Sequence, residues 1–107
     1  MKVLSEMPTD FGGKYVLVDY GNDFFGYGYN TEMHTLCGFP VNQCGTKEEV
    51  LLRCESIIEL CKKYIVEFNN KLAKEKSNPK GWKLLIEHEE LQLEALTEFK
   101  TILLKKG

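Results

Sequence analysis

Residues 46–74 read TKEEVLLRCESIIELCKKYIVEFNNKLAK, and this stretch decides the fold. It opens with a capping box, in which the Thr46 hydroxyl accepts from an amide of the first turn and Glu49 accepts from the Thr46 amide. Apolar residues then recur at steps of three and four, the period of one helical face. They are Val50, Cys54, Ile57, Cys61, Tyr64, Phe68 and Leu72. The pattern predicts one helix that continues to about Lys74.

The next residues end this helix and begin a second one. Asn78 is a favourable cap and Pro79 suits the first helical position, while the Lys105-Lys106 pair suits the negative end of the helix dipole. We therefore expect a helix from Pro79 or Trp82 to Lys105. Since the connection is short, the two helices should form an antiparallel hairpin.

The residues before Thr46 are rich in aromatics and glycine, and they predict strands. Lys14–Tyr20 and Phe24–Asn30 should pair as an antiparallel hairpin across a turn at Gly21-Asn22-Asp23. A third, shorter strand is expected in Thr31–Leu36 or in Phe39–Gln43. The expected fold class is α+β, with a hairpin or three-stranded sheet followed by two long antiparallel helices on one face.

The register of this hairpin gives its sheet two unlike faces. Val16 and Val18 should share one face with Gly26 and Gly28, which is small enough for a helix to approach closely, so we expect the helices there. The other face carries larger side chains, and a cover for it would come from the arm around Met7 and Phe11 or from another protein. Its predicted partner-binding residues are Tyr15, Leu17, Phe25, Tyr27 and Tyr29.

The second helix also has two apolar sides on a helical wheel. We expect the first helix to cover the larger one, which consists of Leu84, Leu85, His88, Leu91, Ala95, Leu96, Phe99, Ile102 and Leu103. The opposite side would then be an exposed interface with a partner or a second copy. Its predicted binding residues are Trp82, Ile86, Glu90, Leu93 and Leu104.

Length and composition favour one globular domain over residues 1–107, with a β-rich part at 1–45 and a helical part at 46–107. The chain is 43% apolar, and its 14 basic and 16 acidic residues give a net charge of −2. This charge argues against nonspecific nucleic-acid binding. Met1–Phe11 lacks the apolar core of a signal peptide and no run is long enough to span a bilayer, so we expect a cytoplasmic protein with reduced thiols.

Candidate reactive groups are few and widely spaced. His34, Cys37 and Cys44 are the best metal ligands on offer, but their spacing is unlike the close pairs of structural zinc sites. Cys54 and Cys61 lie on the apolar stripe of the first helix, so they are expected to be core thiols. We expect no cofactor and no catalytic residue, and a small metal- or thiol-dependent enzyme is kept as an alternative.

One stretch carries a family resemblance. Residues 41–51 read VNQCGTKEEVL, followed by Ile57-Ile58-Glu59-Leu60. With the hairpin before them, they resemble the partial ribonuclease-H-type fold of HicB-like antitoxin domains over about residues 14–61. The resemblance implies neutralisation of a protein partner. The two long helices depart from the family pattern, so DNA-binding autoregulation is not implied.

These observations favour a noncatalytic protein that neutralises a toxin or defence enzyme, as antitoxins and phage anti-defence inhibitors do. Such a protein would cover the active or nucleic-acid-binding surface of its partner. The alternative from another class is a structural homodimer without an inhibitory role.

Overall fold

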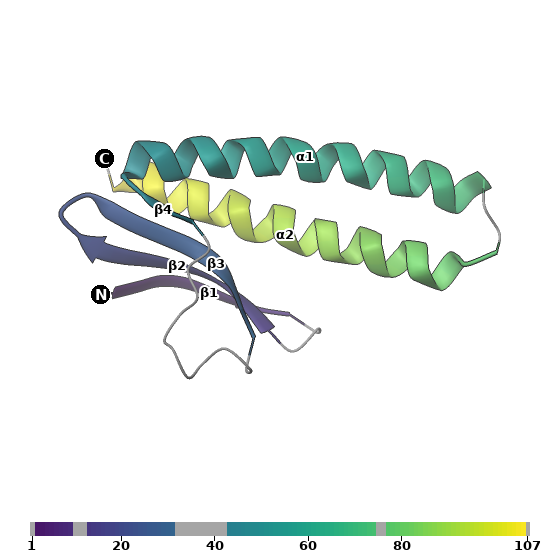
Figure 1. Cartoon of the computed structure of the whole chain (residues 1–107), viewed down its shortest axis with the longest axis horizontal. Helices are drawn as coiled ribbons and strands as arrows, with labels where there is room; N and C mark the ends of the chain where they lie inside the picture. The colour runs from purple at the N-terminus through teal and green to yellow at the C-terminus, as the bar shows by residue number, and fades with distance from the viewer. Residues whose placement is uncertain (1, 10–12, 32–42, 75–76, 107) are drawn as a thin grey trace.

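The structure of the chain is a computed structural model that describes residues 2–9, 13–31, 43–74 and 77–106. Four antiparallel strands form one sheet in the order β1-β2-β3-β4, and two long helices that pack on each other follow it (Figure 1). The predicted α+β class is therefore confirmed. The elements are β1 Lys2–Pro8, β2 Gly13–Gly21, β3 Phe24–Thr31, β4 Gln43–Gly45, α1 Lys47–Lys74 and α2 Pro79–Lys105.

Two strands differ from the prediction. The N-terminal residues form the edge strand β1, which pairs with β2 from Lys2 opposite Asp19 to Pro8 opposite Lys14, whereas the prediction was only an arm in this region. Its Leu4 and Met7 pack against the core, as an arm would also have done. The short β4 overlaps the second candidate strand only at Gln43, and residues 32–42 lie outside the described part of the chain.

The central hairpin has the register that the sequence predicts. Val16 lies opposite Gly28 and Leu17 opposite Tyr27. At the turn, Phe24 pairs with Gly21 rather than with Tyr20, because the ladder shifts after Asp19. Gly21, Asn22 and Asp23 all have positive φ angles, of 89°, 53° and 56°. Glycine and asparagine adopt this conformation at little cost, so the turn residues themselves fix the hairpin.

Both helices begin where the capping signals place them. The Glu49 amide donates to the Thr46 hydroxyl at 3.2 Å, and the Thr46 amide donates to the Glu49 carboxylate at 3.1 Å. The second of these bonds holds the pKa of Glu49 below its ordinary value. At α2 the Asn78 side chain accepts from the Gly81 amide at 3.2 Å. Each cap satisfies donors that the first turn leaves without a partner.

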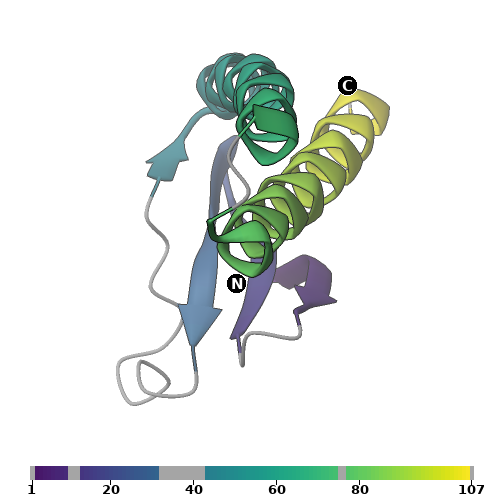
Figure 2. The ribbon, with the colours of Figure 1, turned by 90° about the vertical axis from the view of Figure 1, so that its right-hand side faces the viewer.

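The helices cover the aromatic face of the sheet, so the predicted assignment of the two faces was wrong. Figure 2 shows both helices on one side of the strands. Their core residues pack with Leu17 and Tyr27, and the Tyr27 and Phe99 rings lie 6.5 Å apart. An aromatic side chain buries about 150–250 Å², far more than a glycine offers, so burial of area prevails over closeness of approach. Val16 and Val18 on the opposite face are also completely buried.

The two sides of α2 were also assigned wrongly over its first half. Ile86 is buried, Leu93 packs at the edge of the core, and the Trp82 ring meets Phe68 of α1. Leu84 and Leu85, which were expected to face α1, are 53% and 45% exposed. The reason is that α2 has two neighbours, since α1 runs along its length while the sheet lies only under its second half. The predicted inner residues Ala95, Leu96, Phe99 and Leu103 are buried there.

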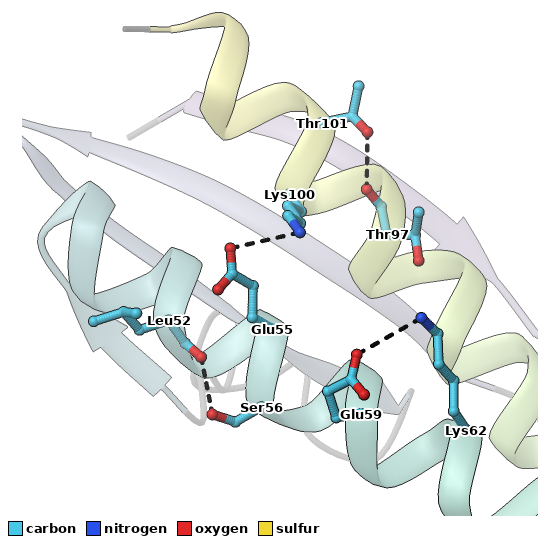
Figure 3. A network of polar contacts seen from close by, with 8 residues as sticks. All are labelled: Leu52, Glu55, Ser56, Glu59, Lys62, Thr97, Lys100 and Thr101. Carbon is cyan, nitrogen blue, oxygen red and sulfur yellow. Dashed lines mark hydrogen bonds and ion pairs between the residues drawn. The ribbon is translucent and has the colours of Figure 1, made fainter.

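Among the described residues, two ion pairs join the helices to each other or to the sheet. Lys100 of α2 lies 3.5 Å from Glu55 of α1 (Figure 3), and Lys106 lies 3.4 Å from Asp19 of β2. All four side chains are partly open to solvent, where an ion pair contributes about 0–1 kcal/mol. Apolar packing therefore dominates the association of the helices with the sheet.

The helical hairpin projects beyond the sheet (Figure 1). The core shared with the sheet ends at Ile58 in α1 and begins at Leu93 in α2. We name the projecting part the overhang; its described residues are Glu59–Lys74 and Pro79–Gln92. The sixteen residues after Ile58 span about 24 Å at 1.5 Å per residue. Neither helix, in the residues described, is apolar enough along its length to cross a membrane.

The capping box at α1 gives the first prediction. Thr46→Ala should lower the free energy of unfolding by about 1 kcal/mol, because two amides lose their cap geometry. Urea unfolding followed by circular dichroism measures the change. Thr101→Ala is the matched control, since the Thr101 hydroxyl only donates to the Thr97 carbonyl within a helix at 3.0 Å. Equal losses in both variants would contradict the role of the cap.

Candidate functional site

A shallow groove of about 550 Å³ lies on the overhang, along the first turns of α2. Leu84 and Leu85 supply its exposed apolar area. We name it the α2 groove, and its lining residues are Asn78, Gly81, Trp82, Leu84, Leu85 and His88. These side chains recur at steps of about one helical turn, so they lie on one side of α2. Toward the C-terminus of α2, the same side faces the sheet.

The end of the groove is shaped by the α2 cap. A Cβ atom on Gly81 would lie 2.6 Å from Nδ2 of Asn78, which is closer than real contacts allow. Glycine at this position therefore permits the Asn78 cap and leaves the groove open above the first turn. A larger residue would disturb both features.

Aromatic rings support the groove from the α1 side. Tyr64 stacks on Phe68 at 5.8 Å between centroids with 12° between the planes, and Phe68 meets Trp82 at 5.9 Å. The Lys71 ammonium lies 5.5 Å from the centre of the Trp82 ring. The tilted rings and the cation are arranged as aromatic quadrupoles favour. This cluster holds Trp82 in place beside the exposed leucines.

The seam between the helices contains a polar pair within the overhang. Cys61 is buried in α1, and its thiol is hydrogen-bonded to the carboxylate of Glu89 in α2. Burial first, and then the Glu89 carboxylate, raises the pKa of Cys61 to about 12. The thiol therefore stays protonated at neutral pH and cannot act as a nucleophile there.

A second, smaller pocket of about 280 Å³ lies between α1 and β3. Its walls include Tyr27, Arg53 and Ser56. The Arg53 guanidinium donates to the Cys44 carbonyl at 2.7 Å, and burial raises the pKa of Tyr27 to about 12. The Tyr27 hydroxyl is buried without a hydrogen-bond partner. This oxygen is sealed from solvent, and the Ser56 hydroxyl already donates to the Leu52 carbonyl at 3.0 Å, so Arg53 is the charged donor among the described lining residues.

The predicted binding residues are placed in different environments. Tyr15, Leu17, Phe25, Tyr27 and Ile86 are buried in this subunit, so they do not form an exposed surface.

Of the remaining predicted residues, Trp82 lines the α2 groove and Leu93 packs at the core edge, while Glu90 and Leu104 are exposed away from the groove. The side chain of Tyr29 lies outside the described part. The prediction missed Leu84, Leu85 and Tyr64 as candidate binding residues. Each belongs to an apolar stripe of its own helix that continues past the end of the sheet.

The candidate metal ligands are not brought together in the part that is described. Cys44 is exposed, while His34 and Cys37 lie outside the described residues. Within residues 2–9, 13–31, 43–74 and 77–106, no three His, Cys, Asp or Glu side chains gather closely enough to hold a metal ion. Cys54 is a buried core thiol, as predicted, and burial raises its pKa to about 12.

Comparisons of the chain with protein-family models, curated proteins and solved structures find no match. The resemblance to HicB-like domains therefore stays a hypothesis that rests on the residues quoted for it.

The buried titratable groups predict sensitivity to alkali. Cys54, Cys61 and Tyr27 all have pKa values raised to about 12 in the folded chain, above the ordinary 9 for a thiol and 10 for a phenol. The unfolded chain releases these protons first, so their stabilisation is complete below pH 9 and is lost as the pH rises toward 12. Thermal unfolding between pH 7 and pH 11 should show a falling midpoint above pH 9. Cys61→Ala should fall less steeply, and an identical slope would contradict the assignment.

Proposed function

We propose that this chain is a noncatalytic binding protein that neutralises a macromolecular partner by covering its active or nucleic-acid-binding surface. The observation that carries the proposal is the α2 groove, where Leu84 and Leu85 are 53% and 45% exposed next to Trp82. Adjacent exposed leucines beside a tryptophan resemble the apolar centre of a protein interface more than an ordinary solvated helix.

The size of the effect supports a role in binding. Burying a whole leucine side chain contributes about 1.5–3 kcal/mol, so covering the exposed halves of Leu84 and Leu85 contributes about 2 kcal/mol. That is a factor of roughly thirty in the dissociation constant. A tryptophan next to them adds the kind of large, rigid contact that dominates many interfaces.

The shape of the molecule suits occlusion. The longest dimension is 51 Å and the shortest is 16 Å, and the helices run along the longest axis (Figure 1). An overhang of about 24 Å can reach a cleft on a partner while the sheet stays outside. Partner neutralisation is also what the HicB-like resemblance implies, although the stretch that carries it covers the sheet and the first half of α1 rather than the groove.

A structural homodimer remains the alternative role. The interface first expected for it is altered, because Trp82, Ile86 and Leu93 face α1 or the core. A dimer would have to use Leu84 and Leu85 instead. The molecular mass in solution separates the two roles.

The test uses capture followed by a functional measurement. The tagged chain retains proteins from the cells that produce it, the retained protein is identified and purified, and its activity is measured with and without the chain. We expect inhibition at equimolar amounts. Leu84→Ser/Leu85→Ser should weaken binding roughly thirtyfold, because about 2 kcal/mol of apolar contact is lost.

Val66→Ser/Leu104→Ser is the matched control. These side chains are 60% and 59% exposed and lie outside the groove, so binding should be unchanged. Retention of a protein whose activity is unaffected would contradict neutralisation. A doubled mass by light scattering that Leu84→Ser/Leu85→Ser abolishes, with no other protein retained, would establish the homodimer instead.

A further inference from the structure

The two ends of the helical hairpin differ in how much they bury. In the part that the sheet covers, α1 buries Val50, Cys54 and Ile58, and the buried residues of α2 that belong to the same cluster are Ala95, Leu96, Phe99 and Leu103. Among the described residues of the overhang, Cys61 and Ile86 are buried, and neither belongs to that cluster. Burial of apolar side chains is the main term that stabilises a fold, so the overhang is held more weakly than the sheet-covered part.

The contacts across the seam of the overhang are of a kind that separates easily. The Cys61 thiol is hydrogen-bonded to the Glu89 carboxylate, a partly exposed group that water solvates when the seam opens. Further along, Phe68 meets Trp82 at 5.9 Å, and both rings are only partly buried. Opening this seam therefore exposes little buried apolar surface.

The helices of the overhang depend on packing for their stability. Isolated helices of about 12–15 residues are marginal in water, and Glu59–Lys74 is close to this length. Both helices continue into the sheet-covered part (Figure 1), which gives each of them a folded end. Because adding a residue to an existing helix is far easier than starting one, the overhang can open and re-form from that end.

We propose that the overhang opens as a unit separate from the sheet-covered part, so that Cys61 becomes accessible while the core stays folded. The seam then controls the reactivity of this thiol, which is 1% exposed in the closed molecule. Cys54 lies about two helical turns earlier in α1 and is 0% exposed inside the core cluster. It should become accessible only when the whole chain unfolds. This inference does not depend on the binding role proposed above, because it concerns the stability of the overhang alone.

The opposite possibility is that the chain unfolds in a single step, as most domains of this size do. The same event would then expose Cys54 and Cys61, and the two thiols would react together. With separate opening, Cys61 reacts first. The two buried thiols of α1 therefore distinguish the two cases within one molecule.

Alkylation of the full chain under native conditions provides the measurement. Iodoacetamide is added for increasing times, and fragment-ion mass spectrometry gives the label on Cys54 and on Cys61. The same reaction in the urea-unfolded chain supplies the intrinsic rate of each thiol. Relative to these intrinsic rates, we expect Cys61 to react at least about tenfold faster than Cys54. Low concentrations of urea should speed Cys61 slightly and Cys54 steeply, because opening the overhang exposes less surface than unfolding the chain.

A matched pair of substitutions separates the two kinds of opening. Leu17→Val shortens a fully buried side chain of the core, whose contacts survive when only the overhang opens. It should speed Cys54 roughly fivefold and leave Cys61 unchanged. Phe68→Leu removes the ring that meets Trp82, a contact that is lost in both kinds of opening, so it should speed both thiols by a similar factor.

Three results would overturn the proposal. A normalised rate at Cys61 that equals or falls below the rate at Cys54 would show that the chain unfolds as one unit. Equal acceleration of both thiols by Leu17→Val would show that both are reached through unfolding of the core. A rate at Cys61 that neither urea nor Phe68→Leu changes would show that the reagent reaches this thiol in the closed molecule.

Discussion

The burial of Phe99 and Leu96 of α2 against Leu17 and Tyr27 of the sheet is the contact on which the other features depend. All four are at most 6% exposed and belong to one apolar cluster. This contact places α2 on the aromatic face of the sheet and fixes where along the helix the sheet ends. The position of the overhang, and with it the α2 groove, follows from this one anchoring point near the C-terminus.

Among the residues that the structure describes, the overhang is stabilised by the seam between α1 and α2 and not by the sheet. The seam contains a polar pair, since the buried Cys61 thiol is hydrogen-bonded to the Glu89 carboxylate. At the far end the seam is reinforced by aromatic contacts, in which Tyr64 stacks on Phe68 and Phe68 meets Trp82 at a tilt. A region with fewer buried apolar contacts opens more readily than the core, and binding surfaces are often drawn from such regions. The overhang therefore combines lower stability with exposed apolar area.

Local signals in the sequence predicted local structure well. The capping residues Thr46 and Asn78 placed the start of each helix, and the turn at Gly21-Asn22-Asp23 set the register of the hairpin. Which face of an element meets which neighbour was not predictable in the same way, because period alone gives two sides and does not say what lies next to each. For this reason Trp82, which was predicted to be exposed, packs on α1, and Leu84, which was predicted to pack on α1, is exposed. The edge strand at Lys2–Pro8 was missed because its mixed residues show no alternation.

The α2 groove is best understood as the continuation of a packing stripe past its partner. Phe99, Ala95 and His88 follow one another at helical spacing, and Leu84 and Leu85 continue the same line. Over the sheet this stripe is buried, and beyond the sheet its leucines are about half exposed. A protein partner that covered Leu84 and Leu85 would take the place that the sheet occupies further along α2.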